Sequence, residues 1–116
     1  MPLLDLFRWR KTETPRITLR LLNFGHDSQE VQLDHFPIVI GRSDAADLPL
    51  KNRLISRTHC ILSFRRGRFV LRDLESRHGT WVNGAKIDEQ TLQVGDEIWI
   101  GTTQLVVEAI AVPQRS

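Results

Sequence analysis

The sequence predicts an all-β domain built as a sandwich, because its apolar residues and its turn residues both follow the pattern of short strands. Apolar side chains recur at every second position in several runs, as they do in strands with one buried face. Glycine, asparagine and aspartate interrupt the runs at close intervals, which gives about ten short strands. With 116 residues, 41% of them hydrophobic, the chain is near the commonest size of a single domain with one core.

Each expected strand follows from its own run of residues. In chain order the strands are expected at residues 16–21, 37–40, 60–64, 69–72 and 98–100, with further short strands between the turn residues. Two turns are expected to close hairpins, one at Arg66 and Gly67 and one at Asn83 and Gly84. Asn-Gly is typical of a type I′ hairpin turn, which needs positive φ at both central residues.

The chain is expected to carry a tail at each end. Residues 1–15 show no strand pattern and are expected to be a flexible tail, residues 16–112 form the domain, and residues 113–116 are a short C-terminal tail. Apolar residues at helical spacing near the start also allow a short amphipathic helix there.

Composition excludes several classes of protein. The longest apolar stretch, residues 105–112, contains Glu108 and is far shorter than the roughly 18 residues of a transmembrane helix. The single cysteine, Cys60, allows neither an intrachain disulfide nor a structural zinc site, and its alternation with Leu62 and Phe64 predicts a core thiol. The N-terminus does not follow the order of a secretory signal. We therefore expect a cytoplasmic protein without metal or cofactor, with recruitment to a membrane-associated complex left open.

Arginine dominates the positive charge of the chain. Thirteen of the 16 cations are arginine, although the formal net charge is only +2. Seven arginines lie between Arg53 and Arg77, where the acidic residues are Asp73 and Glu75. A guanidinium group matches the oxygens of carboxylate and phosphate. The segment predicts either an anion-binding surface or a solvated sheet face.

Three of the expected loops carry an ordered motif. Gly41 and Arg42 follow the apolar run, residues 56–59 read Ser-Arg-x-His, and residues 73–84 read Asp-x-x-Ser-x-x-Gly-Thr-x-Val-Asn-Gly. In this order and spacing, and over about residues 17–110, the chain resembles the forkhead-associated (FHA) domain. The resemblance implies an FHA/SMAD-like sandwich of about eleven strands in two antiparallel sheets. It also implies that loops at one end bind phosphothreonine peptides and that the domain has no catalytic activity.

The resemblance implies a role for each matched residue. Arg42 and Ser56 match the main phosphate ligands, while Arg57 and Arg77 stand where supplementary phosphate contacts are made. A phosphate group carries roughly −1.5 to −2 charges and three acceptor oxygens, which suits arginines and a hydroxyl. The positions expected to support the loops are Gly41, His59, Gly79, Asn83 and Gly84.

Three further positions bear on the peptide. His78 stands where the family usually has an asparagine that holds the peptide backbone. The substitution predicts a different contact with the peptide backbone and a peptide affinity that depends on pH. Leu54, two residues before Ser56, stands where the third residue after the phosphothreonine is read, which predicts an apolar preference. The neighbouring Arg53 would favour an acidic residue instead.

Other functions compete with this interpretation. Ser56, His59 and Asp73 are the residue types of a hydrolase triad, but the serine and histidine share one loop and no nucleophile elbow is present. Nucleic-acid binding is disfavoured by the mild net charge and the absence of a predicted helix. A phosphate-independent interaction or dimerisation module, with Trp81 and Trp99 as candidate exposed aromatics, is the main alternative. The oligomeric state stays open.

Thr12 and Thr14 are candidate phosphorylation sites. They resemble the N-terminal threonine motif of short bacterial FHA regulators, in which a kinase phosphorylates the tail. Thr12 lies five residues before Ile17 and reaches about 17 Å when extended, less than a strand length of about 20 Å to the far loops. Binding of a phosphorylated tail is therefore expected between molecules rather than within one. The expected partners are phosphothreonine proteins, substrates of a Ser/Thr kinase.

Overall fold

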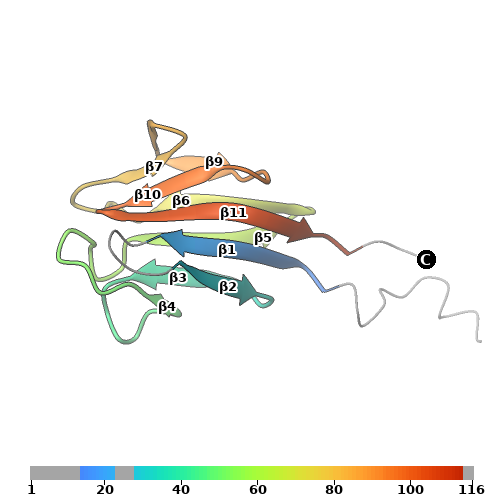
Figure 1. The fold of residues 1–116 in the computed structure, drawn as a ribbon, viewed down its shortest axis with the longest axis horizontal. Helices are drawn as coiled ribbons and strands as arrows, with labels where there is room; N and C mark the ends of the chain where they lie inside the picture. Colours follow the sequence, from blue (N-terminus) through green and yellow to red (C-terminus); the bar gives the residue numbers. More distant parts are fainter. Residues whose placement is uncertain (1–13, 23–27, 114–116) are drawn as a thin grey trace, which may run out of the picture.

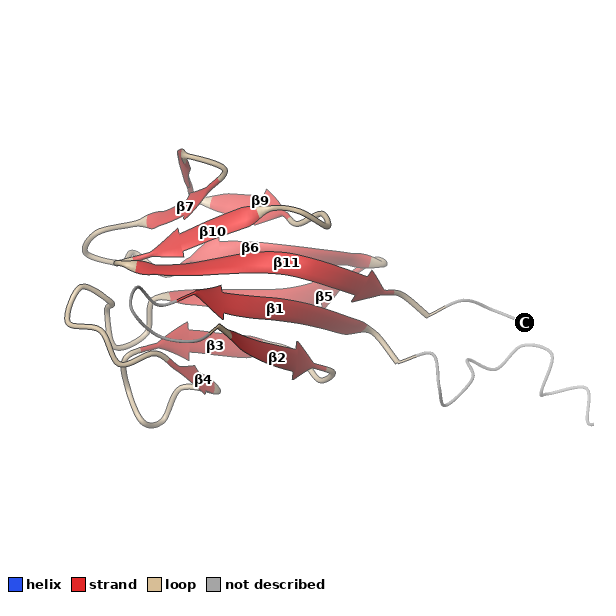
Figure 2. Cartoon of the chain, viewed as in Figure 1, coloured by secondary structure: helices blue, strands red, loops and turns tan. Residues whose placement is uncertain are grey.

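The computed structural model describes residues 14–22 and 28–113, and it arranges them as two facing β-sheets (Figure 1). All regular elements in this part of the chain are strands (Figure 2). They are β1 (Arg16–Leu22), β2 (Gln29–Leu33), β3 (Ile38–Gly41), β4 (Leu48–Pro49), β5 (Cys60–Arg65), β6 (Arg68–Asp73), β7 (Thr80–Val82), β8 (Ala85–Ile87), β9 (Glu89–Thr91), β10 (Glu97–Ile100) and β11 (Thr103–Ala111). The predicted all-β sandwich of about eleven strands is confirmed.

The two sheets differ in size and in one pairing. One sheet has the strand order β2-β1-β11-β10-β7-β8 and the other the order β4-β3-β5-β6-β9. Every pair is antiparallel, as predicted, except β3 with β4, which run parallel through Ile40 opposite Leu48 and Gly41 opposite Pro49. The pair is parallel because the chain after β3 loops out and returns beside it in the same direction.

Alternating apolar residues fill the space between the sheets. Ile98 and Ile100 of β10 are buried between exposed or half-buried neighbours, and the same pattern holds in β5. Phe69 is 1% exposed and packs its ring against Phe64, with ring centroids 4.9 Å apart. Cys60 is fully buried, and this burial raises the pKa of its thiol to about 12. The prediction of a core thiol is confirmed.

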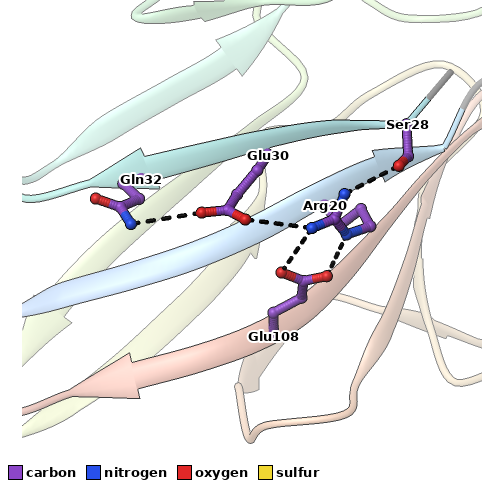
Figure 3. Close-up of polar contacts among 5 residues, drawn as sticks. All are labelled: Arg20, Ser28, Glu30, Gln32 and Glu108. Carbon is purple, nitrogen blue, oxygen red and sulfur yellow. Dashed lines mark hydrogen bonds and ion pairs between the residues drawn. The ribbon is translucent and has the colours of Figure 1, made fainter.

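A β-bulge interrupts the pairing of β1 with β11 and leads to a polar cluster. Thr18 pairs with Ala109 and Leu19 with Val107, so Glu108 is the extra residue. Figure 3 shows Glu108 and Glu30 on either side of Arg20. The Arg20 guanidinium donates to both carboxylates and, from Nη1, to Ser28 at 2.9 Å. This arginine is therefore matched by Glu30 on β2, Glu108 on β11 and Ser28 just before β2.

The sandwich has two unlike ends. One end, called here the loop end, carries residues 42–47, 50–59, 74–79 and the turn at 101–102 (Figure 1). The other, the hairpin end, carries the β5–β6 turn and the outer ends of β1 and β11. Arg66 and Gly67 both have positive φ, at 51° and 78°, which confirms the predicted hairpin turn. No helix in the described residues is long and apolar enough to cross a membrane.

Candidate functional site

Backbone hydrogen bonds hold two of the motif loops together at the loop end. The Arg42 amide donates to the Ser56 carbonyl at 3.0 Å, and the Ser43 amide donates to the Arg57 carbonyl at 3.2 Å. Gly41 permits this approach, because a Cβ at this position would lie 2.0 Å from the Arg57 carbonyl oxygen. Glycine is required here by contact with neighbouring backbone.

Arg42 is held by one of its three guanidinium nitrogens. Its Nε donates to the Ile55 carbonyl at 3.1 Å. Its two terminal nitrogens have no partner among the described residues, although the side chain stands at the edge of a hollow. The guanidinium is thus oriented by the loop while its forked end stays available to an anion.

His59 joins the second loop to the third. It is fully buried, and its Nδ1 accepts from the Ser56 amide at 3.0 Å. Because Nδ1 accepts, the ring proton lies on Nε2, which donates to the Gly79 carbonyl at 2.9 Å. Both ring nitrogens are used by backbone groups of two loops, so His59 is not placed as the base of a triad.

The Ser56 hydroxyl faces the third loop. Its Oγ accepts from the Arg77 amide at 3.0 Å. A hydroxyl that accepts one hydrogen bond still has its own proton to donate. Ser56 can therefore donate to an anion, and Arg77 is brought beside it through the backbone.

Asp73 organises the third loop, a role that sequence reasoning did not assign. One carboxylate oxygen accepts from the Ser76 hydroxyl at 2.6 Å and from the Thr80 hydroxyl at 2.8 Å, and the other accepts from the Ser76 amide at 3.2 Å. Burial alone would raise the pKa of Asp73, but these hydrogen bonds and the nearby His59 outweigh it and hold the pKa below its ordinary value. The spacing Asp-x-x-Ser in the motif was the available signal.

Two predicted glycine positions adopt the conformations that favour glycine. Gly79 has φ +87°, and a Cβ there would lie 2.7 Å from Cε of Lys86. Asn83 and Gly84 have φ 51° and 84°, which confirms the expected type I′ turn. Asn83 also donates through Nδ2 to Asp96 at 2.9 Å, so this turn is tied to the chain before β10.

An open hollow of about 570 Å³ lies at the loop end. Among the described residues its lining is Arg42, Ser43, Asp44, Lys51, Asn52, Arg53 and Arg57. The structure thus brings Arg42, Arg53 and Arg57 around one space. The Ser56, Arg77 and His78 side chains do not line it.

Lys51 is a cation of this hollow that sequence reasoning missed. Its Nζ donates to the Arg42 carbonyl at 3.2 Å and pairs with Asp44. The residue lies outside the three motif segments, and β4 brings it beside β3 only through the parallel pairing. Four cations consequently surround the hollow, with one carboxylate to balance them.

Leu54 and His78 lie on separate loops of the loop end. Leu54 is 44% exposed, and its amide donates to Oδ1 of Asn52 at 2.9 Å. A Cβ on Gly101 would lie 3.2 Å from Cβ of Leu54, so the 101–102 turn packs against Leu54. His78 is exposed, and its carbonyl accepts from Nε1 of Trp81 at 3.2 Å.

The remaining predicted positions are two threonines near the N-terminus and two tryptophans on β7 and β10. Thr12 is outside them, and Thr14 is exposed at the start of the described chain. Trp81 is 39% exposed and pairs with the half-buried Trp99 across β7 and β10. Within the described chain, no group of three or more His, Cys, Asp or Glu side chains is placed to hold a metal ion.

These features define a β-sandwich with a cationic hollow formed by loops at one end. The family model of the FHA domain matches residues 38–101, which is more than half of the chain, and the chain belongs to this family. The match contains all three motif loops and both turns that close the predicted hairpins.

Sequence and structural similarity to known proteins is consistent with this family. The chain is 38% identical over 74 residues to the oxoglutarate dehydrogenase inhibitor of Corynebacterium efficiens, covering 64% of this chain and 52% of that protein. It therefore spans about half the length of that curated relative. The FhaA FHA domain, solved in complex with the intracellular domain of Rv3910, superposes with a TM-score of 0.72 at 32% identity, covering 79% of this chain and 99% of that one. An FHA domain studied for phosphothreonine-dependent interactions gives a TM-score of 0.70 at 29% identity, covering 79% and 96%.

Proposed function

We propose that residues 16–112 form a non-catalytic module that binds phosphothreonine-containing proteins in Ser/Thr kinase signalling. The observation that carries this proposal is Arg42, whose Nε is fixed to the Ile55 carbonyl while its forked end borders a hollow lined by three further cations. A dianionic phosphate is the ligand that this charge and geometry suit best. Phosphothreonine-dependent interaction of a similar FHA domain supports the same conclusion.

The geometry of the loop end supports a set of phosphate ligands. Arg42 supplies the forked cation and Ser56 a hydroxyl donor, because the Ser56 oxygen already accepts from the Arg77 amide. Arg57 and Lys51 add positive charge from the lining of the hollow, and Arg77 adds charge beside Ser56. Charge-assisted bonds of this kind contribute about 1.5 to 3 kcal/mol each before ordering costs, which fits micromolar affinity, about −8 kcal/mol in total.

Neighbouring residues set the peptide preference. Leu54 offers an exposed apolar contact, supported by Asn52 and Gly101, for the third residue after the phosphothreonine. Arg53 lines the hollow itself, so it contributes to phosphate attraction and favours nearby acidic residues. His78 holds the peptide backbone less firmly than an asparagine, since an amide presents its donor and acceptor side by side, whereas the two ring nitrogens of an imidazole point in different directions.

The proposed setting is the cytoplasm, where Ser/Thr kinases mark their substrates and a lone buried cysteine stays reduced. Recruitment to a membrane-associated complex would follow from the partner rather than from this chain. Thr12 and Thr14 remain candidate acceptors for the same kinase, with the phosphorylated tail bound by another molecule.

Titration with an oriented phosphothreonine peptide library tests the proposal. Phosphoserine and unphosphorylated versions are titrated beside it, and Leu54→Glu is included to test the third position. Micromolar binding confined to phosphothreonine, weaker at high salt because of screening over about 8 Å at physiological ionic strength, is the expected result. Equal binding of all three peptides would contradict the proposal and favour a phosphate-independent interaction module.

A further inference from the structure

The outer surface of β5 and β6 carries a second group of arginines, three of them at the hairpin end. We call it the arginine face: Arg65 on β5, Arg66 in the turn, and Arg68 and Arg72 on β6. All four are exposed. An open hollow of about 650 Å³ lies among them, lined by Arg65, Arg66, Arg68, Val70 and Thr91. The face is concave, with short apolar and hydroxyl side chains from β6 and β9 between the guanidinium groups.

The described chain supplies few acidic partners for the arginine face. Arg65 donates to Glu89 at 3.0 Å, whereas Arg66, Arg68 and Arg72 make no ion pair with any residue of the described chain. Arg65 and Arg68 stand directly opposite each other across the two strands, a placement of like charges that costs stability. Arg20 on the other sheet, in contrast, is held by two glutamates and a serine (Figure 3).

The chemistry of the face favours carboxylates. Glu89 already occupies one side of it and forms an ion pair with Arg65, so a carboxylate fits these arginines in the folded protein. The same glutamate repels any further anion, so the attraction for a ligand comes from Arg66, Arg68 and Arg72. Three strands at about 4.8 Å spacing give a surface roughly 10 Å wide, which suits one extended peptide chain. A run of aspartate or glutamate residues is therefore the matching ligand.

The arginine face lies within reach of a peptide that is bound at the loop end. β5 has six residues and runs from the loop end to Arg65 in the hairpin-end part of the arginine face, a distance of roughly 17 Å at about 3.4 Å per residue. An extended chain covers this distance with about five or six residues. One partner polypeptide can consequently occupy both ends at once.

We propose that the arginine face is a second binding surface, which takes an acidic segment of the same phosphoprotein at least about six residues from its phosphothreonine. The inference of a shared partner rests on the proposed function, while the binding of acidic peptide does not. Two weak contacts on one chain reinforce each other, because the second becomes intramolecular with an effective concentration near millimolar.

The first test uses an unphosphorylated octaglutamate peptide and the ¹⁵N-labelled full chain at low salt, where exposed ion pairs are strongest. The largest amide shifts are expected at Arg65, Arg66, Arg68 and Thr91. The double variant Arg66→Ala/Arg68→Ala should weaken binding at least tenfold, whereas Arg42→Ala at the loop end should leave it unchanged. Shifts confined to Arg42 and Arg57, or binding indifferent to the double variant, would overturn the proposal.

Competition identifies the kind of ligand. Octaglutamate should bind the arginine face more tightly than an octathymidylate or vesicles containing phosphatidylserine at equal charge. Tighter binding of either competitor would assign the face to nucleic acid or to a lipid surface and overturn the acidic-peptide proposal. Because none of these probes carries phosphothreonine, failure of the proposed function would leave their result unaffected.

A linked peptide tests the shared partner. Phosphothreonine is joined through eight neutral residues to an acidic block, placed before it in one peptide and after it in another. At least one should bind three- to tenfold more tightly than the phosphothreonine peptide alone, and the double variant should abolish that gain. The short phosphothreonine peptide should bind the double variant as it binds the original chain. No gain in either direction would refute a shared partner.

Discussion

Both ends of the sandwich are rich in arginine, yet the two ends treat their arginines differently. At the loop end Arg42 is fixed through Nε, and the loops around it are joined by buried His59 and by the hydrogen bonds of Asp73. At the hairpin end the arginines stand on a regular strand pair and a two-residue turn, and only Arg65 has an acidic partner. At the loop end, buried polar groups fix the orientation of the loops and of Arg42. At the hairpin end, the arginines supply positive charge, but few contacts fix their side chains. The difference predicts specific recognition at one end and weaker, less specific attraction at the other.

The largest expected effect is the loss of stability when His59 is replaced. Replacement by alanine leaves the Ser56 amide and the Gly79 carbonyl without their buried partner and opens a cavity, so we expect a loss of about 3 to 5 kcal/mol of folding free energy. Urea unfolding measures this loss. A matched change at the exposed His35, on the hairpin side, should cost less than about 0.5 kcal/mol. Equal effects at the two positions would show that His59 does not join the loops.

The second largest effect is expected for the replacement of Asp73, and this loss of stability depends on pH. Its folded-state pKa is lowered, so its ionised form stabilises the fold at pH above the unfolded value, and this contribution disappears as pH falls through the folded pKa. Asp73→Asn should cost about 1 to 2 kcal/mol of folding free energy at pH 7 and progressively less in acid. Unfolding curves of both proteins between pH 7 and pH 3 measure the difference. A difference that stays constant with pH would contradict this role.

His78 gives a smaller effect of opposite sign. Asparagine at this position presents a donor and an acceptor side by side toward one peptide group, which the diverging ring nitrogens of histidine do not, so His78→Asn should tighten phosphothreonine peptide binding by about 1 kcal/mol. Calorimetric titration at pH 7 measures the gain. Because His78 is exposed, the folding free energy should not change. Weaker binding by the variant would mean that the imidazole itself holds the peptide.

The smallest effect is expected on the arginine face. Arg68→Ala removes one of two like charges that stand opposite each other. The free energy of unfolding should therefore change by less than about 0.5 kcal/mol, and any change should be an increase in stability. Thermal unfolding at low salt is the sensitive measurement. A marked loss of stability would show that this arginine is a structural residue.

Local patterns predicted much of the fold. Alternation identified β5 and β10, and Asn-Gly and Arg-Gly pairs located two turns with positive φ. The two-residue β4 could not be predicted, because its pairing with β3 depends on the path of a loop and leaves no alternating run. The bulge at Glu108 was equally hidden, since it is a property of how two distant strands align.

The candidate site was predicted in part, and for a related reason. The motif located the three loops and the positions of Arg42, Ser56 and His59. Lys51 was missed, because only the tertiary fold brings it beside Arg42. The hollow also separates residues that the motif treats alike, since Arg57 lines it and Arg77 does not.

The most direct test of the central claim compares one change made at both ends. A seven-residue phosphothreonine peptide, too short to join the loop end to the arginine face, is titrated into the original chain, Arg42→Ala and Arg68→Ala. Arg42→Ala should lose about 2 to 5 kcal/mol of binding free energy with its fold intact, because phosphate charge is left unpaired, while Arg68→Ala should bind unchanged. Equal losses in the two variants, or none in Arg42→Ala, would contradict the assignment of the phosphate site to the loop end.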